Sequence, residues 1–391
     1  MIMERNHLGP DIKTILADKG LDGDSLFWKE RLERAGAADV ERALSLPAGV
    51  YSFDKLVALV SPAAVGYLEA MARLSHQVTV QRFGNTIKLY APLYLSNHCV
   101  NSCRYCGFNR RTDFERTRLT VAEAAAEADI IAAEGFTDIL LVSSEDREFV
   151  GIDYLCELVQ RLRGKFSSTS VEIYPVEEAE YARLFKAGIE GVTLYQETYD
   201  RAAYEYYHPA GPKADYDNRL KTPDRIASAG MRELGVGVLL GLNNWRSEAL
   251  ALAEHAHYLM KRYWQCHVSI SFPRLRPAYK VGDTEFRHLI SDKELVQMIT
   301  ALRLCFADVG LVLSTRERAE LRNRLMKLGI TRMSAGSKTN PGGYSGRDET
   351  IRQFEIDDNR SPGEVAAMIR AQGAEPVWKD WDTAFIGLPI P

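Results

Sequence analysis

Three cysteines lie within one short stretch, NHCVNSCRYCGFN, which begins at Asn97. Cys99, Cys103 and Cys106 have the spacing Cys-x-x-x-Cys-x-x-Cys. A structural zinc site needs four ligands, and the local fourth candidate, His98, adjoins Cys99 and would have to fold back on its neighbour. The spacing instead supplies three of the four ligands of a [4Fe-4S] cluster. One iron would stay open, and an open iron can bind a substrate or cosubstrate.

The composition is that of a large globular protein. The chain has 391 residues, is 46% hydrophobic and carries a formal net charge of -4 with both signs interspersed. We therefore expect no binding of nucleic acid and no attraction to an anionic membrane. No secretory signal or long apolar run is apparent, so we expect a soluble, cytoplasmic protein. Six cysteines are too few for a disulfide scaffold, and Cys156, Cys266 and Cys305 are expected to pack in the core.

Eight β-rich runs alternate with amphipathic or alanine-rich segments along most of the chain. The expected strands are 86–96, 137–144, 170–175, 191–197, 234–241, 267–272, 311–316 and 330–335. Strands that alternate with helices in this way indicate β-α units and a parallel sheet. No Gly-x-Gly-x-x-Gly turn follows the first strand, so we predict an α/β fold of the (β/α)8 TIM-barrel type rather than a doubly wound sheet. The cysteines would then follow the first strand, at the end of the barrel where active sites lie.

Two extensions flank the predicted barrel. Residues 1–82 carry apolar residues at three-and-four spacing and are expected to form a helical N-terminal extension, followed by the barrel at 83–336. Residues 337–391 begin with a Gly-, Asn- and Pro-rich stretch and are expected to form a loop-helix tail that packs on the barrel. We expect Trp378 and Trp381 in this tail to pack inward rather than against a partner.

The cysteine motif, with Tyr105 before its last cysteine and Gly107 and Phe108 after it, resembles the radical S-adenosylmethionine (SAM) superfamily. The resemblance narrows to the 2-iminoacetate synthases (ThiH), the tyrosine lyases of thiamine biosynthesis, over about residues 38–382. It is carried by RFGNTIKLYAPLYLSNHCVNSCRYCGF, GVTLYQETYDRAAY, SFPRLRPA, LSTRE, MSAGSKTNPGGY and EPVWKDWD. It implies a [4Fe-4S] cluster on the three cysteines, SAM as cosubstrate, and cleavage of the Cα–Cβ bond of L-tyrosine into 2-iminoacetate (dehydroglycine) and p-cresol.

The resemblance also implies which side chains bind SAM. Glu145, after the second strand, would bind the SAM amino group, although Ser144 stands where the superfamily usually has Gly. Arg219 would bind the SAM carboxylate, since its planar fork matches two oxygens. Glu197, at the end of the fourth strand, would contact SAM or orient Arg219.

The substrate carboxylate is assigned by the same resemblance. Arg316 and Ser334 end the seventh and eighth predicted strands, so both would reach the barrel mouth and hold this carboxylate. Arg274 and Arg276, after the sixth strand, are further candidates for substrate positioning. The alternative for one of these two is an ion pair with an acid at the rim.

Two protein partners are implied as well. Reduced flavodoxin or ferredoxin would supply the electron, and the thiazole synthase ThiG would receive 2-iminoacetate, which hydrolyses readily. A tryptophan lyase similar to NosL remains an alternative, because its pocket cannot be distinguished in the sequence. The hydrogenase-maturation tyrosine lyase HydG has further C-terminal cysteines, whereas no cysteine follows Cys305 here. A zinc protein or a simple electron carrier would not need so large a barrel.

Overall fold

The predicted barrel is present in the computed structural model, which describes residues 9–378 except positions 24, 283, 285 and 348. Parallel strands follow one another in chain order, and β1 pairs with both β2 and β8, which closes the ring. The strands are β1 (Thr86–Ser96), β2 (Asp138–Ser143), β3 (Ser168–Glu172), β4 (Gly191–Thr193), β5 (Glu233–Gly237), β6 (His267–Ser271), β7 (Gly310–Leu313) and β8 (Arg332–Ser334). The predicted (β/α)8 fold is confirmed.

Most strands end earlier than the sequence predicts, and β4 is the clearest case. It ends at Thr193, whereas the sequence predicts a strand to residue 197. The amides of Leu194 and Gln196 still donate to carbonyls of β5, at 2.8 and 3.0 Å. After Thr193 the chain therefore stays hydrogen-bonded to β5 but no longer to β3, and it leaves the sheet at the open end of the barrel.

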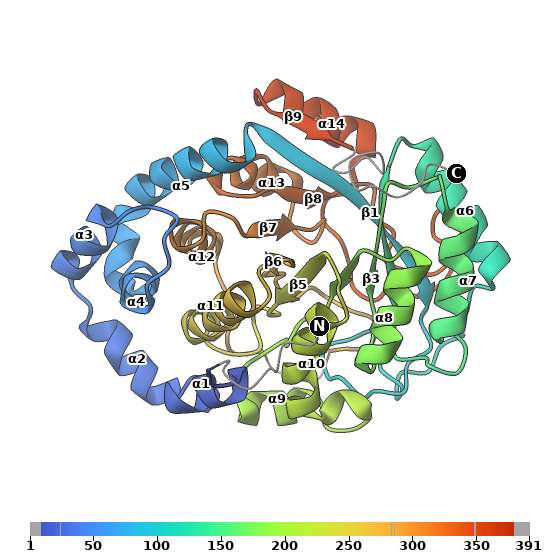
Figure 1. Ribbon diagram of the computed structural model, residues 1–391, viewed down its shortest axis with the longest axis horizontal. Coiled ribbons are helices and arrows are strands. Elements are labelled where there is room, and N and C mark those ends of the chain that lie inside the picture. Colours follow the sequence, from blue (N-terminus) through green and yellow to red (C-terminus); the bar gives the residue numbers. More distant parts are fainter. Residues whose placement is uncertain (1–8, 24, 283, 285, 348, 379–391) are drawn as a thin grey trace, which may run out of the picture.

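Helices surround the barrel (Figure 1). They are α6 (Val121–Ala133), α7 (Ile152–Leu162), α8 (Glu178–Ala187), α9 (Arg201–Tyr207), α10 (Tyr216–Ser228), α11 (Trp245–Arg262), α12 (Asp292–Cys305) and α13 (Ala319–Leu325). Their starts are marked by capping residues: in α6, Thr120 and Glu123 each accept a hydrogen bond from the other's backbone amide. The apolar faces of the helices and the outward-facing strand residues share one continuous core.

The N-terminal extension forms an arc of helices beside α11 and α12 (Figure 1). Its helices are α1 (Ile12–Asp18), α2 (Ser25–Arg34), α3 (Ala37–Ser45), α4 (Phe53–Val60) and α5 (Leu68–Phe83). Buried polar contacts join α4 to α12: the Lys55 ammonium donates to the Leu304 carbonyl at 2.7 Å, and the Gln297 amide donates to the Leu59 carbonyl at 2.9 Å. The extension is thus packed into the same core as the barrel.

No single helix in the described part of the chain is long and apolar enough to span a membrane. A bent pair, α4 with the helical segment 62–83, passes the same length and composition test, with an angle of 75° between its two parts. Every residue of α4 from Lys55 to Val60 is buried in the protein core.

The C-terminal part contributes an additional strand that the sequence does not reveal. After a loop at 337–360 come α14 (Pro362–Ala371) and β9 (Glu375–Val377), and β9 lies parallel to the first residues of β1. The Trp378 ring packs edge-on against Phe136, with ring centroids 5.2 Å apart, so its predicted inward packing is confirmed. Trp381 lies outside the described residues. The division of the chain at residues 82 and 336 stays a prediction.

The end of the barrel where the strands begin is filled by charged side chains. Lys88 lies 2.7 Å from Asp138, and Arg332 lies 2.6 Å from Asp138 and 3.1 Å from Glu233. These four residues come from the starts of different strands and are largely buried. Paired charges thus close this end of the barrel, and the opposite end is left for the site.

Candidate active site

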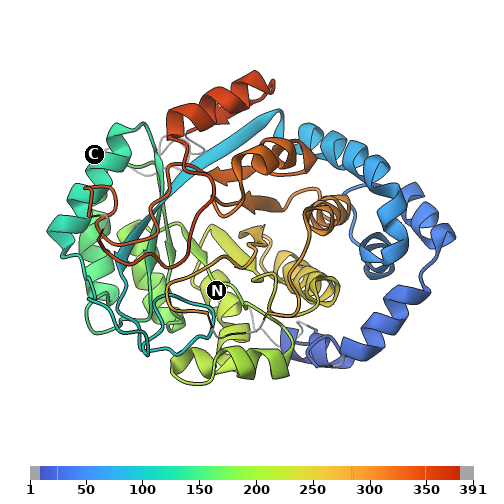
Figure 2. The same ribbon diagram turned by 180° about the vertical axis from the view of Figure 1, so that it is seen from behind.

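A cavity of about 180 Å³ opens at the carboxyl ends of the strands. Its walls include eight of the site residues predicted from the sequence: Cys99, Cys103, Cys106, Glu145, Glu197, Arg219, Arg316 and Ser334. The loop after β1, residues 97–118, and the loop 337–360 both cross this end of the barrel (Figure 2). The structure therefore gathers residues from seven segments of the sequence around one space.

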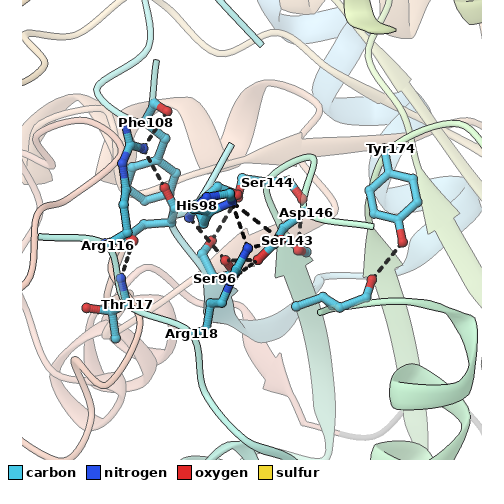
Figure 3. Close-up of polar contacts among 12 residues, drawn as sticks. Ser96, His98, Phe108, Arg116, Thr117, Arg118, Ser143, Ser144, Asp146 and Tyr174 are labelled. Atoms are coloured by element: carbon cyan, nitrogen blue, oxygen red, sulfur yellow. Dashed lines mark hydrogen bonds and ion pairs between the residues drawn. The ribbon is translucent and has the colours of Figure 1, made fainter. Parts of the chain in front are cut away.

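Arg116 holds the cysteine loop in shape from within. Its guanidinium donates to the carbonyls of Asn97 and Phe108, both at 2.8 Å, and to those of Asn109 and Thr112, at 2.7 and 2.9 Å. The contact with Phe108 is visible in Figure 3. Four carbonyls of the loop thus converge on one cation, which fixes the path of the chain around the three thiols.

Gly107 seats the cysteine loop against the loop 337–360. Its amide donates to the Gln353 carbonyl at 3.1 Å. A Cβ at position 107 would lie 2.9 Å from the Arg352 carbonyl oxygen and 3.0 Å from that of Gln353, so a side chain would push the two loops apart. Gln353 also contacts the motif directly, since its side-chain amide lies 3.9 Å from the Cys106 sulfur.

The three thiols suit an iron-sulfur cluster better than zinc. Among the described residues no three His, Cys, Asp or Glu side chains form a finished metal site. Cys99, Cys103 and Cys106 nevertheless line the same cavity as free thiols, and no further cysteine or histidine of the described ranges lines it. Burial raises the pKa of Cys103 to about 12 and that of Cys106 to about 11, so metal binding must displace protons from them. Three sulfur donors fit a cluster with one open iron.

Asn101 connects the cysteine loop to Glu145. Its side-chain amide donates to the Glu145 carboxylate at 2.8 Å, and its carbonyl oxygen accepts from the Lys213 backbone amide at 2.9 Å. Ser144, which replaces the usual Gly, donates to the His98 carbonyl at 2.6 Å (Figure 3). The departure from the superfamily pattern thus adds a contact between β2 and the cysteine loop.

His98 contacts residues that hold the cysteine loop in place, and it does not face the cavity. Its imidazole lies 3.4 Å from Asp146, and Arg118 pairs with the same carboxylate at 2.8 Å (Figure 3). The Ser96 hydroxyl also donates to Asp146, at 2.8 Å. Among the described residues, His98 is not part of the cavity wall.

Glu197 adopts a left-handed backbone conformation with φ of 73°, which is costly for a residue with a side chain. Its carboxylate lies 2.6 Å from the Lys213 ammonium and 3.6 Å from the Arg219 guanidinium. Burial alone would raise the pKa of Glu197, but the two cations outweigh burial and lower it. Arg219 also donates to the Tyr195 carbonyl at 2.6 Å, so the site holds this guanidinium from two sides.

Arg316 lies in the cavity wall, and none of the described acidic residues pairs with it. Its guanidinium lies 3.4 Å from the centre of the Phe354 ring and donates to the Arg274 carbonyl at 3.3 Å. In the described part of the chain no carboxylate is within ion-pair distance of it. Burial lowers the pKa of Arg316, which is the cost of an uncompensated cation.

Ser334 presents its hydroxyl to the same cavity and is firmly held. The Thr315 amide donates to this hydroxyl at 3.1 Å. Behind the strand, Arg322 donates to the Ser334 carbonyl and pairs with Asp358, and both charged groups are fully buried. The ion pair therefore fixes the end of β8 and the end of the loop 337–360 together.

Arg274 and Arg276 do not reach the cavity. Arg274 lies 3.0 Å from Asp292 and also binds the Glu317 carboxylate, at 2.9 Å from its Nε atom. Arg276 pairs with Asp357. Pairing with an acid, expected as the alternative for one of them, is thus found for both. Any influence of Arg274 on substrate would pass through Glu317 or through Arg316, which donates to the Arg274 carbonyl, and both of these residues line the cavity.

Asn101, Glu172 and Lys213 are among the cavity-lining residues that sequence reasoning missed. Glu172 could have been noticed, because a charged residue near the carboxyl end of the otherwise apolar run SVEIYP is typical of a barrel active site. Asn101 and Lys213 carry no such signal, because their importance lies in the partners that the fold gives them.

Comparisons with known proteins agree with this geometry. Residues 93–254 match the model of the radical SAM superfamily, and residues 271–375 match that of the Biotin and Thiamin Synthesis associated domain. The 2-iminoacetate synthase of Escherichia coli (strain K12) is 45% identical over 364 residues, which cover 93% of this chain and 95% of that protein. The chain belongs to the 2-iminoacetate synthase family. The 2-iminoacetate synthase of Salmonella typhimurium (strain LT2) is likewise 45% identical, over 92% of this chain and 95% of that protein.

Solved structures place the 2-iminoacetate synthase fold among related barrels. The FeFe-hydrogenase maturase HydG from Carboxydothermus hydrogenoformans superimposes with a TM-score of 0.86 at 30% identity, covering 95% of this chain and 86% of that one. Methylornithine synthase (PylB) has a TM-score of 0.67 at 21% identity, covering 86% of this chain and 96% of that one, which shows the fold alone. As a 2-iminoacetate synthase family member, the protein is a radical SAM lyase, and its cofactors are a [4Fe-4S] cluster and SAM.

Proposed function

We propose that this protein cleaves the Cα–Cβ bond of L-tyrosine and releases p-cresol and 2-iminoacetate for thiazole formation in thiamine biosynthesis. One observation carries the proposal: a single cavity is lined by three free thiols and by Arg316, a half-buried guanidinium with no acidic partner among the described residues. The thiols suit the cofactor, and the guanidinium suits the carboxylate of an amino acid. The similarity to 2-iminoacetate synthases supports the product.

The cofactor half of the site is assigned to residues of the cysteine loop and of β2, β4 and α10. When bound and reduced, the cluster and SAM would supply the radical chemistry that removes a hydrogen atom from the substrate amino group, with methionine and 5'-deoxyadenosine as the products of SAM. Cys99, Cys103 and Cys106 would hold the cluster. Glu145, fixed by Asn101, would accept from the SAM amino group, and Arg219 would bind the SAM carboxylate.

The substrate half is assigned to β7, β8 and the loop 337–360. Arg316 and Ser334 would hold the tyrosine carboxylate, the first by charge and the second by its hydroxyl. Gln353 accepts a hydrogen bond of 2.8 Å from the Tyr94 hydroxyl, so the loop is attached to β1 above the cavity. Excluding water in this way protects a reactive radical from side reactions.

Two protein partners follow from this proposal. A reduced flavodoxin or ferredoxin would supply two electrons, one for SAM cleavage and one, taken up with a proton, for the 4-hydroxybenzyl fragment that leaves as p-cresol. The exposed side chains of Arg104, Arg110 and Arg111 on the cysteine loop suit an acidic carrier. The thiazole synthase ThiG would receive 2-iminoacetate before it hydrolyses. We place the reaction in the cytoplasm, because all six cysteines are free and a reducing compartment keeps them so.

The test is an anaerobic assay of the reconstituted protein with SAM, a strong reductant and one amino acid at a time. With tyrosine we expect p-cresol, glyoxylate from hydrolysed 2-iminoacetate, and 5'-deoxyadenosine. With tryptophan we expect no cleaved side chain. Consumption of tryptophan with tyrosine left intact would replace the proposed substrate with that of a tryptophan lyase.

A further inference from the structure

Four carboxylates line the described walls of the cavity, and three of them already have partners. Glu145 accepts from Asn101, Glu197 pairs with Lys213, and Glu317 pairs with Arg274. The fourth, Glu172, forms no hydrogen bond or ion pair with any described residue. It is the last residue of β3, and because side chains alternate along a strand, Val171 faces the outer core while Glu172 faces the cavity.

The cations in the same walls show the same pattern. Lys213 and Arg219 both face Glu197, at 2.6 and 3.6 Å, whereas Arg316 has no acidic partner among the described residues. Counting only residues that the structure describes, the cavity wall has one acid and one base without an ion-pair partner, Glu172 and Arg316, and the two are not within ion-pair distance of each other.

Leaving two opposite charges apart in a buried space is costly. Burial raises the pKa of Glu172 to about 7, and the nearby Glu197 carboxylate adds to this rise. Burial also lowers the pKa of Arg316. A ligand that carries both a positive and a negative group would relieve both costs, because it would pair each free charge without requiring the two side chains to meet.

An α-amino acid is such a ligand. We propose that Glu172 binds the α-ammonium group of the amino-acid substrate, opposite the carboxylate site formed by Arg316 and Ser334. The assignment rests on the proposed function for the identity of the amino acid. It deepens that function, because the amino group held by Glu172 is the group from which hydrogen is taken.

Three ligands that differ by one charged group test this assignment. L-tyrosine carries both charges, 3-(4-hydroxyphenyl)propionate lacks the ammonium group, and tyramine lacks the carboxylate. Equilibrium dissociation constants are measured by calorimetry on the reconstituted enzyme with SAM, without reductant, so that no turnover occurs. A charged hydrogen bond typically changes affinity by about tenfold or more, so the wild type should prefer tyrosine to each analogue by at least about tenfold.

Variants at position 172 should change one preference and spare the other. In Glu172→Gln, the preference for tyrosine over the propionate should fall below about threefold, since a neutral amide cannot pair with an ammonium group. Its preference for tyrosine over tyramine should persist. Glu172→Asp should restore part of the lost preference for tyrosine over the propionate. In Arg316→Gln, the preference for tyrosine over tyramine should fall, and the preference over the propionate should persist. Glu33→Gln, an exposed change on α2, serves as the matched control and should leave both ratios unchanged.

The outcomes separate this assignment from the substrate proposal. If Glu172→Gln retains the wild-type preference for tyrosine over the propionate, or if both preferences collapse equally in the Gln and Asp variants, Glu172 is not the ammonium site. If the enzyme binds tryptophan instead of tyrosine, the proposal that tyrosine is the substrate fails. The same comparison with tryptophan, indole-3-propionate and tryptamine then still tests whether Glu172 binds the ammonium group.

Discussion

Asn101 lies between two of the three motif cysteines, and its side-chain amide donates a hydrogen bond of 2.8 Å to Glu145 at the end of β2. Both groups are buried. The loop that would carry the cluster and the residue that would bind the SAM amino group are therefore positioned as one unit.

Replacing Asn101 with Ala should weaken SAM binding without loss of iron. Removing a donor from a buried charged acceptor costs about 1.5–3 kcal/mol, which corresponds to a rise of about tenfold or more in the SAM dissociation constant. Calorimetry and iron analysis on the same preparations check this. Asn359→Ala, an exposed change in the C-terminal loop, is the control. Unchanged SAM affinity in Asn101→Ala would show that Glu145 does not need this contact.

Replacing Cys103 with Ala should remove the cluster and all reductive SAM cleavage. About four irons per chain are expected for the reconstituted wild type, and two thiols should hold much less. Iron content and 5'-deoxyadenosine formation are the measurements. Cys156→Ala, in α7 on the outside of the barrel, should retain both. Full SAM cleavage by Cys103→Ala would refute the assignment of the motif as cluster ligands.

The activity should fall as the pH drops below about 7, because of Glu172. Burial raises the pKa of its carboxyl to about 7. Below this pH the free enzyme carries a neutral carboxyl that cannot pair with an ammonium group, so kcat/KM for tyrosine at pH 6 should be about tenfold below its plateau. In Glu172→Gln this decline should be absent, although the plateau itself is lower. A decline of the same shape in the variant would assign the titration to another group.

Several charged groups face Glu172 and set its titration. They are Glu197, which raises its pKa, and Arg316, Lys213 and Arg219, which lower it. Tyr94 and Tyr195 also face it, and burial raises their pKa values well above 10, so they do not titrate in this range. Glu248 is buried outside the cavity, with a pKa also raised to about 7 by burial. The Glu172→Gln profile therefore separates the two carboxyls.

Replacing Lys213 with Met should destabilise the fold and weaken SAM binding together. Removing one partner of a buried ion pair typically costs about 3–5 kcal/mol, and Arg219 offsets part of this, so we expect a loss of about 2 kcal/mol. Arg219 would be drawn toward Glu197 and away from SAM. Thermal unfolding and SAM titration measure the two effects, with Lys293→Met as an exposed control. A loss of stability with normal SAM affinity would mean that Arg219 is positioned by Tyr195 alone.

The sequence predicts the barrel and the cysteine site because their signals are local. Each strand is a short apolar run, and the three cysteines lie within one loop. β9 is different: it has three residues, and it becomes a strand only by pairing with the start of β1. No local pattern marks such an element, since its stability comes from its distant partner.

The same limit explains the two arginines at strand ends. Arg274 and Arg316 look equivalent in the sequence, since each follows a strand at the open end of the barrel. They differ in the structure because Glu317 and Asp292 neutralise Arg274 and leave Arg316 without an acidic partner in the described residues. Which cation remains free depends on where acids from other segments are placed, and this is a property of the tertiary fold.

The pairing of β1 with β8 and β9 also fixes the order in which the protein can fold during synthesis. β1 and the cysteine loop leave the ribosome well before β8 and β9, which are two of the three neighbours of β1. Contacts between such distant segments form late and slowly. Gly107 packs against the carbonyl oxygens of residues 352 and 353. A nascent chain that ends before these residues therefore exposes its three thiols on a loop that lacks this contact. The cysteine loop can therefore reach its final conformation only after residues 352 and 353 have been synthesised.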